Sequence, residues 1–151
     1  MVLVEGEPGI GKSRLLGESV SDAAGQGFSL AAGAADRLGR TIPFFASRAA
    51  LRADLERRAA VAPVLVSLDD LQWASPAMLA ALRSLPGEMK GHPIAWIFAR
   101  SSARNEDAGL LFSVLERDGA TRITLDRSVA TRWRVCSPTR SARRPARTCW
   151  P

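Results

Sequence analysis

A glycine-rich stretch near the start of the chain holds the residues whose types and spacing are best suited to chemistry. It reads Gly6-Glu7-Pro8-Gly9-Ile10-Gly11-Lys12-Ser13. Glycines let several backbone N–H groups converge on a polyphosphate without side chains in the way. The lysine brings a positive charge to the β- and γ-phosphates, and the serine hydroxyl is a ligand for Mg²⁺. This complete G-x-x-x-x-G-K-S pattern predicts a binding site for a nucleoside triphosphate.

The elements on either side of this stretch are those that such a loop requires. A short buried strand is predicted over Met1 to Glu5, which contains the apolar run Met1 to Val4, and Lys12 to about Gly25 predicts a helix. A helix that begins at the loop directs the positive end of its dipole toward the anion. The glycine spacing is G-x-x-G-x-G, which excludes the dinucleotide-binding fingerprint. The predicted nucleotide-binding residues are Gly6, Glu7, Pro8, Gly9, Ile10, Gly11, Lys12, Ser13 and Arg14.

Two acidic residues supply the second part of the predicted site. Asp69 and Asp70 follow residues 63–68, an apolar run of strand length that is typical of a parallel strand covered on both faces. At the end of such a strand Asp69 is a candidate ligand for Mg²⁺, together with Ser13. Asp70 is the candidate group that orients or deprotonates an attacking water. The pair predicts that the nucleotide is bound with a metal ion.

Arg100 is the third part of the predicted site. It follows Ile94 to Ala99, another apolar run of strand length. From a neighbouring strand end, its charge can reach the γ-phosphate and report whether that phosphate is present. The alternative is a surface arginine in an ordinary ion pair. The candidate catalytic residues are therefore Lys12, Asp70 and Arg100.

The rest of the chain alternates between strand and helix patterns. Strands are predicted over residues 28–32 and 120–125, helices over residues 44–62, 75–85 and 105–118, and a loop over residues 33–43. Ser75 is a suitable N-cap, whereas Pro86 is expected to stop the same helix. The charged face of the helix at 44–62 is expected to be solvated. The alternation predicts the three-layer α/β fold of P-loop NTPases, with a mostly parallel sheet and ligands beyond the carboxyl ends of its strands.

The positive charge of the chain is concentrated at its end. Residues 1–126 carry 14 Lys and Arg against 15 Asp and Glu, whereas residues 127–151 carry seven Arg and no acid. We therefore predict an ATPase core over 1–126 and a basic, disordered tail over 127–151. A nucleic-acid-binding module that uses the tail is an alternative function. Cys136 and Cys149 have no partners for a metal site, and His92 is expected on the surface.

Two stretches resemble a known family. Val2 to Leu16 and Val64 to Ser75, the latter containing Asp69-Asp70-Leu71-Gln72-Trp73-Ala74-Ser75, are similar to the ATPase domain of large LuxR-type transcriptional regulators. These regulators belong to the STAND class of AAA-like signalling ATPases. The resemblance implies that the Arg100 strand lies between the other two site strands. It also implies an ATP-dependent switch that controls transcription, in which DNA is bound only through regions absent from this chain. A cytoplasmic protein is expected separately, because no signal peptide is apparent at the N-terminus. Trp73 is expected to pack where its strand meets the next helix.

The sequence also departs from this family. The chain starts inside the first motif and lacks the segment that helps to hold adenine, so we expect an incomplete fold that binds ATP with weak or no hydrolysis. Such a sheet exposes apolar surface and favours self-association.

No stretch is suited to a membrane span. A small P-loop kinase is a further alternative. The arginine-rich tail is consistent with a frameshift in a GC-rich gene. When Val129 to Trp150 are back-translated with GC-rich codons and read one base out of phase, the resulting sequence can have a helical pattern.

Overall fold

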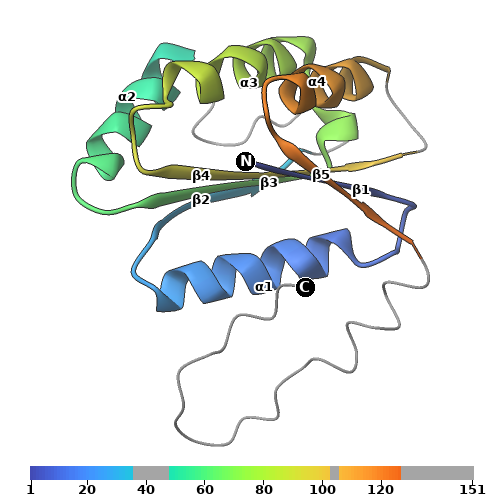
Figure 1. The fold of residues 1–151 in the computed structure, drawn as a ribbon, viewed down its shortest axis with the longest axis horizontal. Helices are drawn as coiled ribbons and strands as arrows, with labels where there is room; N and C mark the ends of the chain where they lie inside the picture. Colours follow the sequence, from blue (N-terminus) through green and yellow to red (C-terminus); the bar gives the residue numbers. More distant parts are fainter. Residues whose placement is uncertain (36–47, 103–105, 127–151) are drawn as a thin grey trace, which may run out of the picture.

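The computed structural model describes residues 1–35, 48–102 and 106–126 (Figure 1). Its elements are β1 (Val2–Gly6), α1 (Lys12–Gly25), β2 (Ser29–Ala34), α2 (Arg48–Ala59), β3 (Val64–Asp69), the 3₁₀ helix η1 (Leu71–Trp73), α3 (Pro76–Glu88), β4 (Ile94–Ser101), α4 (Glu106–Arg117) and β5 (Thr121–Leu125). The strands form one sheet in the order β2-β3-β4-β1-β5, and each neighbouring pair is parallel. Helix α1 covers one face, and α2, α3 and α4 cover the other.

The predicted fold class is confirmed by this arrangement. Strand β4, which carries Arg100, lies between β1 and β3, as the family resemblance implied. The predictions for the basic tail and for most of the loop before α2 concern residues 127–151 and 36–47, which are outside the described part of the chain, as are residues 103–105. Within the described ranges, every helix is too short or too polar to span a lipid bilayer.

The sheet separates two hydrophobic cores. The larger core lies between the sheet and helices α2 to α4 and contains Leu3 and Phe98, both fully buried. The smaller core lies beneath α1 and contains Val4, Leu16 and Ala99. Because successive side chains of a strand point to opposite faces, neighbours such as Leu3 and Val4 belong to different cores. Helices on both faces therefore explain why these strands are apolar runs without alternation.

Helix α3 extends past the proline that was expected to end it. The predicted stop at Pro86 is wrong, because α3 continues to Glu88 with Pro86 inside its last turn. Proline removes one backbone hydrogen bond, but the Met89 N–H still donates to the Leu85 carbonyl at 3.0 Å. Leu85 and Met89 are both buried in the larger core. Packing of these two side chains thus stabilises the turn that the proline weakens.

The start of α3 follows the prediction and allows a test. The Ser75 hydroxyl accepts a hydrogen bond from the Met78 N–H at 3.3 Å, and Pro76 is the first helical residue. We expect Ser75→Ala to lower the free energy of unfolding by about 1 kcal/mol, because one first-turn N–H loses its acceptor. Urea denaturation measures this change. Ser84→Ala, which alters a serine in the body of the same helix, is the control and should change stability by less than about 0.5 kcal/mol.

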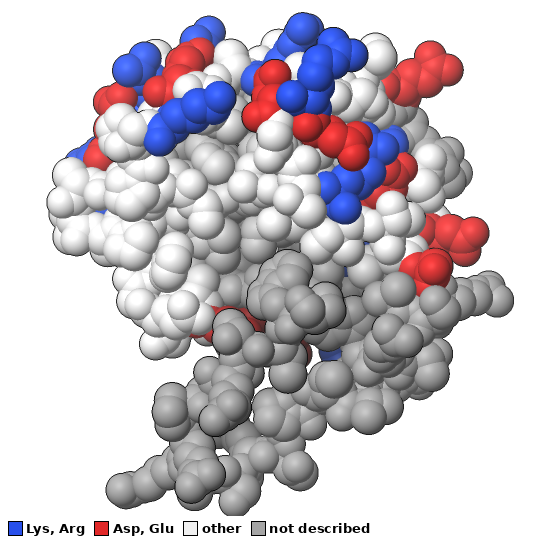
Figure 2. Space-filling view, in the orientation of Figure 1, with Lys and Arg blue, Asp and Glu red and all other residues white. Residues whose placement is uncertain are grey.

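The charged residues of α2 pair with one another. Arg52 Nε lies 2.8 Å from Glu56 Oε1, and Arg58 Nε lies 2.6 Å from Asp54 Oδ2. Figure 2 shows basic and acidic side chains interleaved over the helices on this side of the molecule. Pairs of this kind contribute roughly 0–1 kcal/mol each. The charged face of α2 is therefore a solvated face, as the sequence predicted.

Candidate functional site

The glycine-rich loop connects the end of β1 to the start of α1, and its three glycines are needed for two different reasons. Gly9 and Gly11 have φ angles of 78° and 107°, in the left-handed region that glycine adopts without strain. Gly6 is buried, and a Cβ added to it would lie 2.8 Å from the Leu125 carbonyl oxygen and 2.9 Å from Ile10 Cγ2. The loop path therefore needs backbone freedom at two positions and close packing at the third.

The N-terminus of α1 presents backbone N–H groups to the loop. Gly11 is the N-cap residue, and no side chain caps this helix end. The first N–H groups of a helix have no intrahelical acceptor, and they form a ready anion site together with the helix dipole. Ser13 and Arg14 are exposed at this end. The N–H groups of this helix end are therefore left without a side-chain cap, and they are the donors that the sequence interpretation assigns to a phosphate.

Lys12 is directed into the loop. Its Nζ donates to the Gly6 carbonyl oxygen at 3.1 Å and to the Glu7 carbonyl oxygen at 2.9 Å. Only 6% of the residue is exposed, although its neighbours Gly11 and Ser13 are exposed. An ammonium group has three donors, so one remains for a phosphate oxygen after these two bonds. The loop carbonyls hold the charge beside the backbone donors of α1.

Asp69 ends β3 on the face of the sheet that carries α1. Two residues earlier, Ser67 pairs in register with Ile97, which packs in the smaller core beneath α1. The alternation of a strand places Asp69 on the same face as Ser67. One carboxylate oxygen of Asp69 accepts the Asp70 N–H at 2.7 Å. A carboxylate offers several further lone pairs, so Asp69 fits the role of a metal ligand beside the loop.

Asp70 is fixed by a residue that the sequence interpretation did not assign to the site. Asp70 has a φ angle of 55°, and its Oδ1 accepts a hydrogen bond from Gln72 Nε2 at 2.8 Å. The other end of the same amide, Gln72 Oε1, accepts the Ser101 N–H at 2.8 Å. Gln72 is buried and thereby ties the end of β3 to the end of β4. The available sequence signal was an amide side chain two residues after Asp70, within the acidic motif. The neighbouring Trp73 packs against the larger core, as expected.

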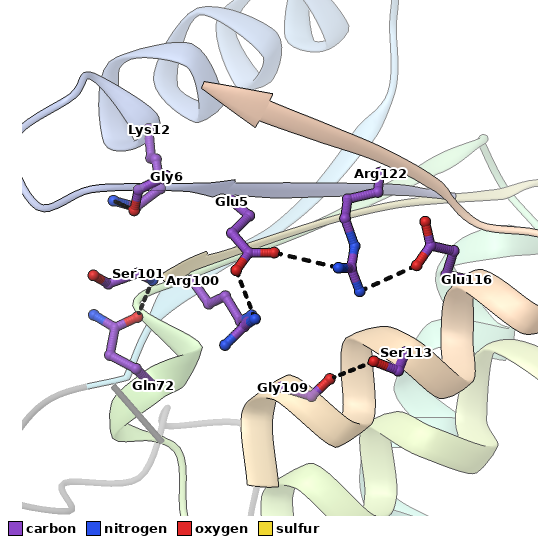
Figure 3. A network of polar contacts seen from close by, with 10 residues as sticks. All are labelled: Glu5, Gly6, Lys12, Gln72, Arg100, Ser101, Gly109, Ser113, Glu116 and Arg122. Atoms are coloured by element: carbon purple, nitrogen blue, oxygen red, sulfur yellow. Dashed lines mark hydrogen bonds and ion pairs between the residues drawn. The ribbon is translucent and has the colours of Figure 1, made fainter. Parts of the chain in front are cut away.

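Arg100 lies on the opposite face of the sheet from Lys12 (Figure 3). Its Nη2 donates to Glu5 Oε1 at 2.6 Å, and its guanidinium carbon lies 5.2 Å from the centre of the Phe112 ring. Both charged side chains are nearly buried. The structure therefore gathers Lys12, Asp69 and Asp70 at one edge of the sheet, whereas the Arg100 guanidinium is held between β1 and α4.

The Glu5 carboxylate is the centre of a network that the sequence interpretation also missed. Its second oxygen lies 3.6 Å from Arg122 Nη1, and Arg122 Nη2 lies 3.2 Å from Glu116 Oε2. The network thus joins β1, β4, β5 and α4 directly behind the loop, as Figure 3 shows. An acid at the end of an otherwise apolar strand was the available sequence signal.

A concave site of about 330 Å³ adjoins the loop on the side of β5. It is lined by Glu7, Ile10, Leu125 and Asp126.

For a metal ion, the candidate protein ligands are Ser13 in the loop and Asp69 at the end of β3. The described residues contain no cluster of three or more His, Cys, Asp or Glu. Mg²⁺ bound with a triphosphate needs only one or two protein ligands. His92 is exposed, as predicted.

The parallel sheet and the loop between β1 and α1 define a P-loop NTPase-like fold. No protein-family model and no curated protein matches the chain. Among solved structures, AMPPCP-bound DnaA from Aquifex aeolicus has a TM-score of 0.58 at 16% identity and covers 89% of this chain and 42% of its own. A DNA replication initiation factor has a TM-score of 0.58 at 15% identity, with the same two coverages of 89% and 42%.

A third similar structure is the cytoplasmic domain of the type VII secretion ATPase EccC from Thermomonospora curvata. Its TM-score is 0.56 at 17% identity, and the match covers 83% of this chain and 19% of that one. The chain spans less than half the length of each of these proteins. At 15–17% identity, structural similarity establishes only the fold. The function has to be inferred from the residues of the site.

Proposed function

We propose that residues 1–126 form an ATP-binding domain that holds Mg·ATP at the loop between β1 and α1. The observation that carries the proposal is the convergence of the first-turn N–H groups of α1 with the buried Lys12 ammonium group. Together these donors match the negative oxygens of a β,γ-phosphate pair. Residues 6–14 supply the contacts, and the AMPPCP in the similar DnaA structure supports a nucleotide as the ligand.

The metal ion that accompanies ATP would be held by Ser13 and Asp69. Both are on the α1 side of the sheet at its carboxyl edge, where a bound triphosphate brings its own oxygen ligands. The ion would neutralise phosphate charge and orient the nucleotide. Asp69 contributes the one formal negative charge to this ligand pair, so the affinity for the metal depends on it.

Binding is proposed in preference to rapid turnover. Asp70, the candidate that orients water, is already engaged by Gln72, and aspartate is shorter than the glutamate found at this place in many hydrolysing P-loop enzymes. Arg100 would have to leave Glu5 before it could contact a γ-phosphate. Lys12, Asp70 and Arg100 therefore remain catalytic candidates for slow hydrolysis only.

We further propose that this domain belongs to a signalling ATPase of the LuxR-type regulator kind. The support is the pair of stretches at Val2 to Leu16 and Val64 to Ser75, which the fold brings together at one edge of the sheet. In that role ATP occupancy switches a longer protein, and DNA contact comes from other regions. Nucleotide-dependent promoter binding by a longer protein that contains this domain would test this finer assignment.

The Mg²⁺ dependence of ATP binding tests the site. Titration with a fluorescent ATP analogue should show binding that Mg²⁺ strengthens roughly tenfold or more, about 1.4 kcal/mol. Asp69→Asn should reduce this strengthening to about twofold, because asparagine keeps an oxygen for the Asp70 N–H but loses the charge that favours Mg²⁺. Asp118→Asn, at an exposed aspartate after α4, is the matched control and should behave as wild type.

Two results would contradict the proposal. If the folded wild-type chain does not bind ATP with or without Mg²⁺, the site is not a nucleotide site. If Asp69→Asn and Asp118→Asn keep the same full Mg²⁺ dependence, Asp69 is not the metal ligand, even though nucleotide binding itself would stand.

A further inference from the structure

The face of the sheet that carries α1 is only partly covered. Helix α1 packs mainly over β2, β3 and β4 and has few contacts with β5, and no other described helix lies on this face (Figure 1). Val2, Ile97 and Ile123 belong to this face and are partly exposed. We call these three residues the apolar patch. Beside it in the sheet, Ala95 and Thr121 are exposed, so apolar side chains are open to solvent next to α1.

Partial exposure is unusual at these positions. Strands β1 and β4 are interior strands of the sheet, and interior parallel strands are normally covered on both faces. On the opposite face, Leu3 and Phe98 are fully buried beneath helices, although each is the chain neighbour of a residue of the apolar patch. An exposed apolar surface of this kind marks an interaction site. The apolar patch is thus a surface that a further segment is expected to cover.

The described part of the chain ends beside this patch. Leu125, the last residue of β5, pairs in register with Gly6, and Asp126 follows it. Residues 127–151 continue directly from there. Ile123 is three residues before Asp126, which is about 10 Å along a strand, whereas ten extended residues reach roughly 33 Å. A segment that turns back after Asp126 is therefore long enough to cross the whole patch.

The first part of that segment has a sequence pattern that suits an apolar surface. Residues 129–135 read Val-Ala-Thr-Arg-Trp-Arg-Val. In an extended conformation Val129, Trp133 and Val135 would share one side, and Arg132 and Arg134 would share the other, because successive side chains alternate. One side could then bury apolar area while the other keeps its charges in water.

The charge on the α1 side of the molecule complements the charge of this segment. The exposed charged side chains of the loop, of α1 and of the end of β5 are Glu7, Arg14, Glu18, Asp22 and Asp126. Four of these five are acidic, whereas residues 127–151 carry seven Arg and no acid. The helices on the opposite side carry interleaved charges of both signs, as Figure 2 shows. Electrostatic attraction therefore favours the α1 side as the surface that the basic segment contacts.

We propose that residues 129–135 dock on the apolar patch of their own chain, with the side that carries Trp133 against Ile97 and Ile123. A second copy of the chain is the competing occupant. The chain's own segment is tethered within a few residues of the patch, which gives it an effective concentration of about millimolar. The inference changes the expectation of a disordered tail for these residues alone, and it does not depend on nucleotide binding.

A nitroxide label on Cys136 tests the inference. Cys136 directly follows the proposed docking residues, and Cys149→Ser leaves it as the one cysteine of the chain. In the isotope-labelled full chain, the amide signals of the apolar patch should lose most of their intensity, because the unpaired electron lies close to them. The signals of Leu110, an exposed residue of α4 on the opposite side of the sheet, should be unchanged. Nuclear magnetic resonance spectra before and after reduction of the nitroxide measure both effects.

Two variants of the tail define the controls. Trp133→Ser should abolish the loss of signal, because it removes the largest apolar side chain of the docking residues. Trp150→Ser alters a tryptophan outside these residues and should leave the loss intact. Trypsin provides a second measurement: cleavage after Arg132 and Arg134 should be roughly tenfold slower in the wild type than in Trp133→Ser, because a docked segment has to open before it is cut. Neither substitution alters the described core.

The possible outcomes separate the two occupants. If the patch signals keep their intensity, or if Trp133→Ser and Trp150→Ser show the same loss, the segment does not dock there and the inference is wrong. A mixture of nitroxide-labelled chains with separate isotope-labelled chains should show no loss. Loss in this mixture would mean that a second copy occupies the patch, which equally overturns the inference. An equal loss at Leu110 would mean contact without a preferred surface and has the same consequence.

Discussion

Replacing Lys12 with alanine should weaken Mg·ATP binding roughly 100-fold or more, because a charge-assisted hydrogen bond and the charge itself are lost together. Lys12 is nearly buried in the loop, and two loop carbonyls already hold its ammonium group in place. Little side-chain ordering is therefore needed when a phosphate arrives. Equilibrium titration with fluorescent Mg·ATP measures the loss.

Lys90→Ala is the matched control for this prediction. Lys90 is the second of the two lysines in the chain, and it is exposed beyond the end of α3. Its removal changes the net charge by the same amount and should leave the ATP dissociation constant within about twofold. Thermal unfolding of both variants without nucleotide distinguishes lost binding from lost folding. If a folded Lys12→Ala variant binds Mg·ATP like the Lys90→Ala variant, the loop is not a phosphate site.

Replacing Glu5 with alanine should lower the free energy of unfolding by about 3–5 kcal/mol, the range for breaking a buried ion pair. Glu5 accepts from Arg100 at 2.6 Å and lies 3.6 Å from Arg122, and these side chains are largely buried. The Nε atoms of both arginines already lack partners among the described residues. Without the carboxylate, two guanidinium groups would be left poorly paired behind the loop. Urea or guanidinium denaturation measures the effect.

Glu116→Ala is the control for the Glu5 prediction. Glu116 contacts the same Arg122 at 3.2 Å, but its side chain is 48% exposed. Water screens an exposed pair, so this variant should change stability by about 0–1 kcal/mol. Glu5→Gln keeps an acceptor for Arg100 and should lie between the two. If Glu5→Ala is no more destabilised than Glu116→Ala, the network does not contribute to stability as proposed.

Local patterns in the sequence were sufficient for the elements of this fold. The glycine-rich loop and the helix that begins at Lys12 were predicted because glycine conformation and helix initiation depend on residues close together in the chain. Apolar runs indicated β3 and β4 because both faces of a parallel sheet are covered. The prediction that α3 ends at Pro86 was wrong because it relied on a local signal alone. The burial of Leu85 and Met89, which is a tertiary effect, outweighs the preference of proline for a helix end.

The roles of polar residues at the strand ends depended on tertiary structure. The sequence predicted that Asp69 and Arg100 meet at one edge of the sheet, and parallel strands do place their backbones there. It did not indicate that Glu5 would engage Arg100, or that Gln72 would connect Asp70 to the end of β4. These contacts join residues 29 and 95 positions apart, so no local pattern reports them.

By itself, then, the sequence determined a glycine-rich loop between a strand and a helix, an acidic strand end and an α/β class of fold. Only the tertiary structure decided that Ser101 shares the face of the loop and Arg100 does not. The alternation of a strand requires these two neighbours to point apart, but the face that each one takes depends on the register of β4 with β1. That register results from packing against α1 on one side and α4 on the other, which involves the whole described chain.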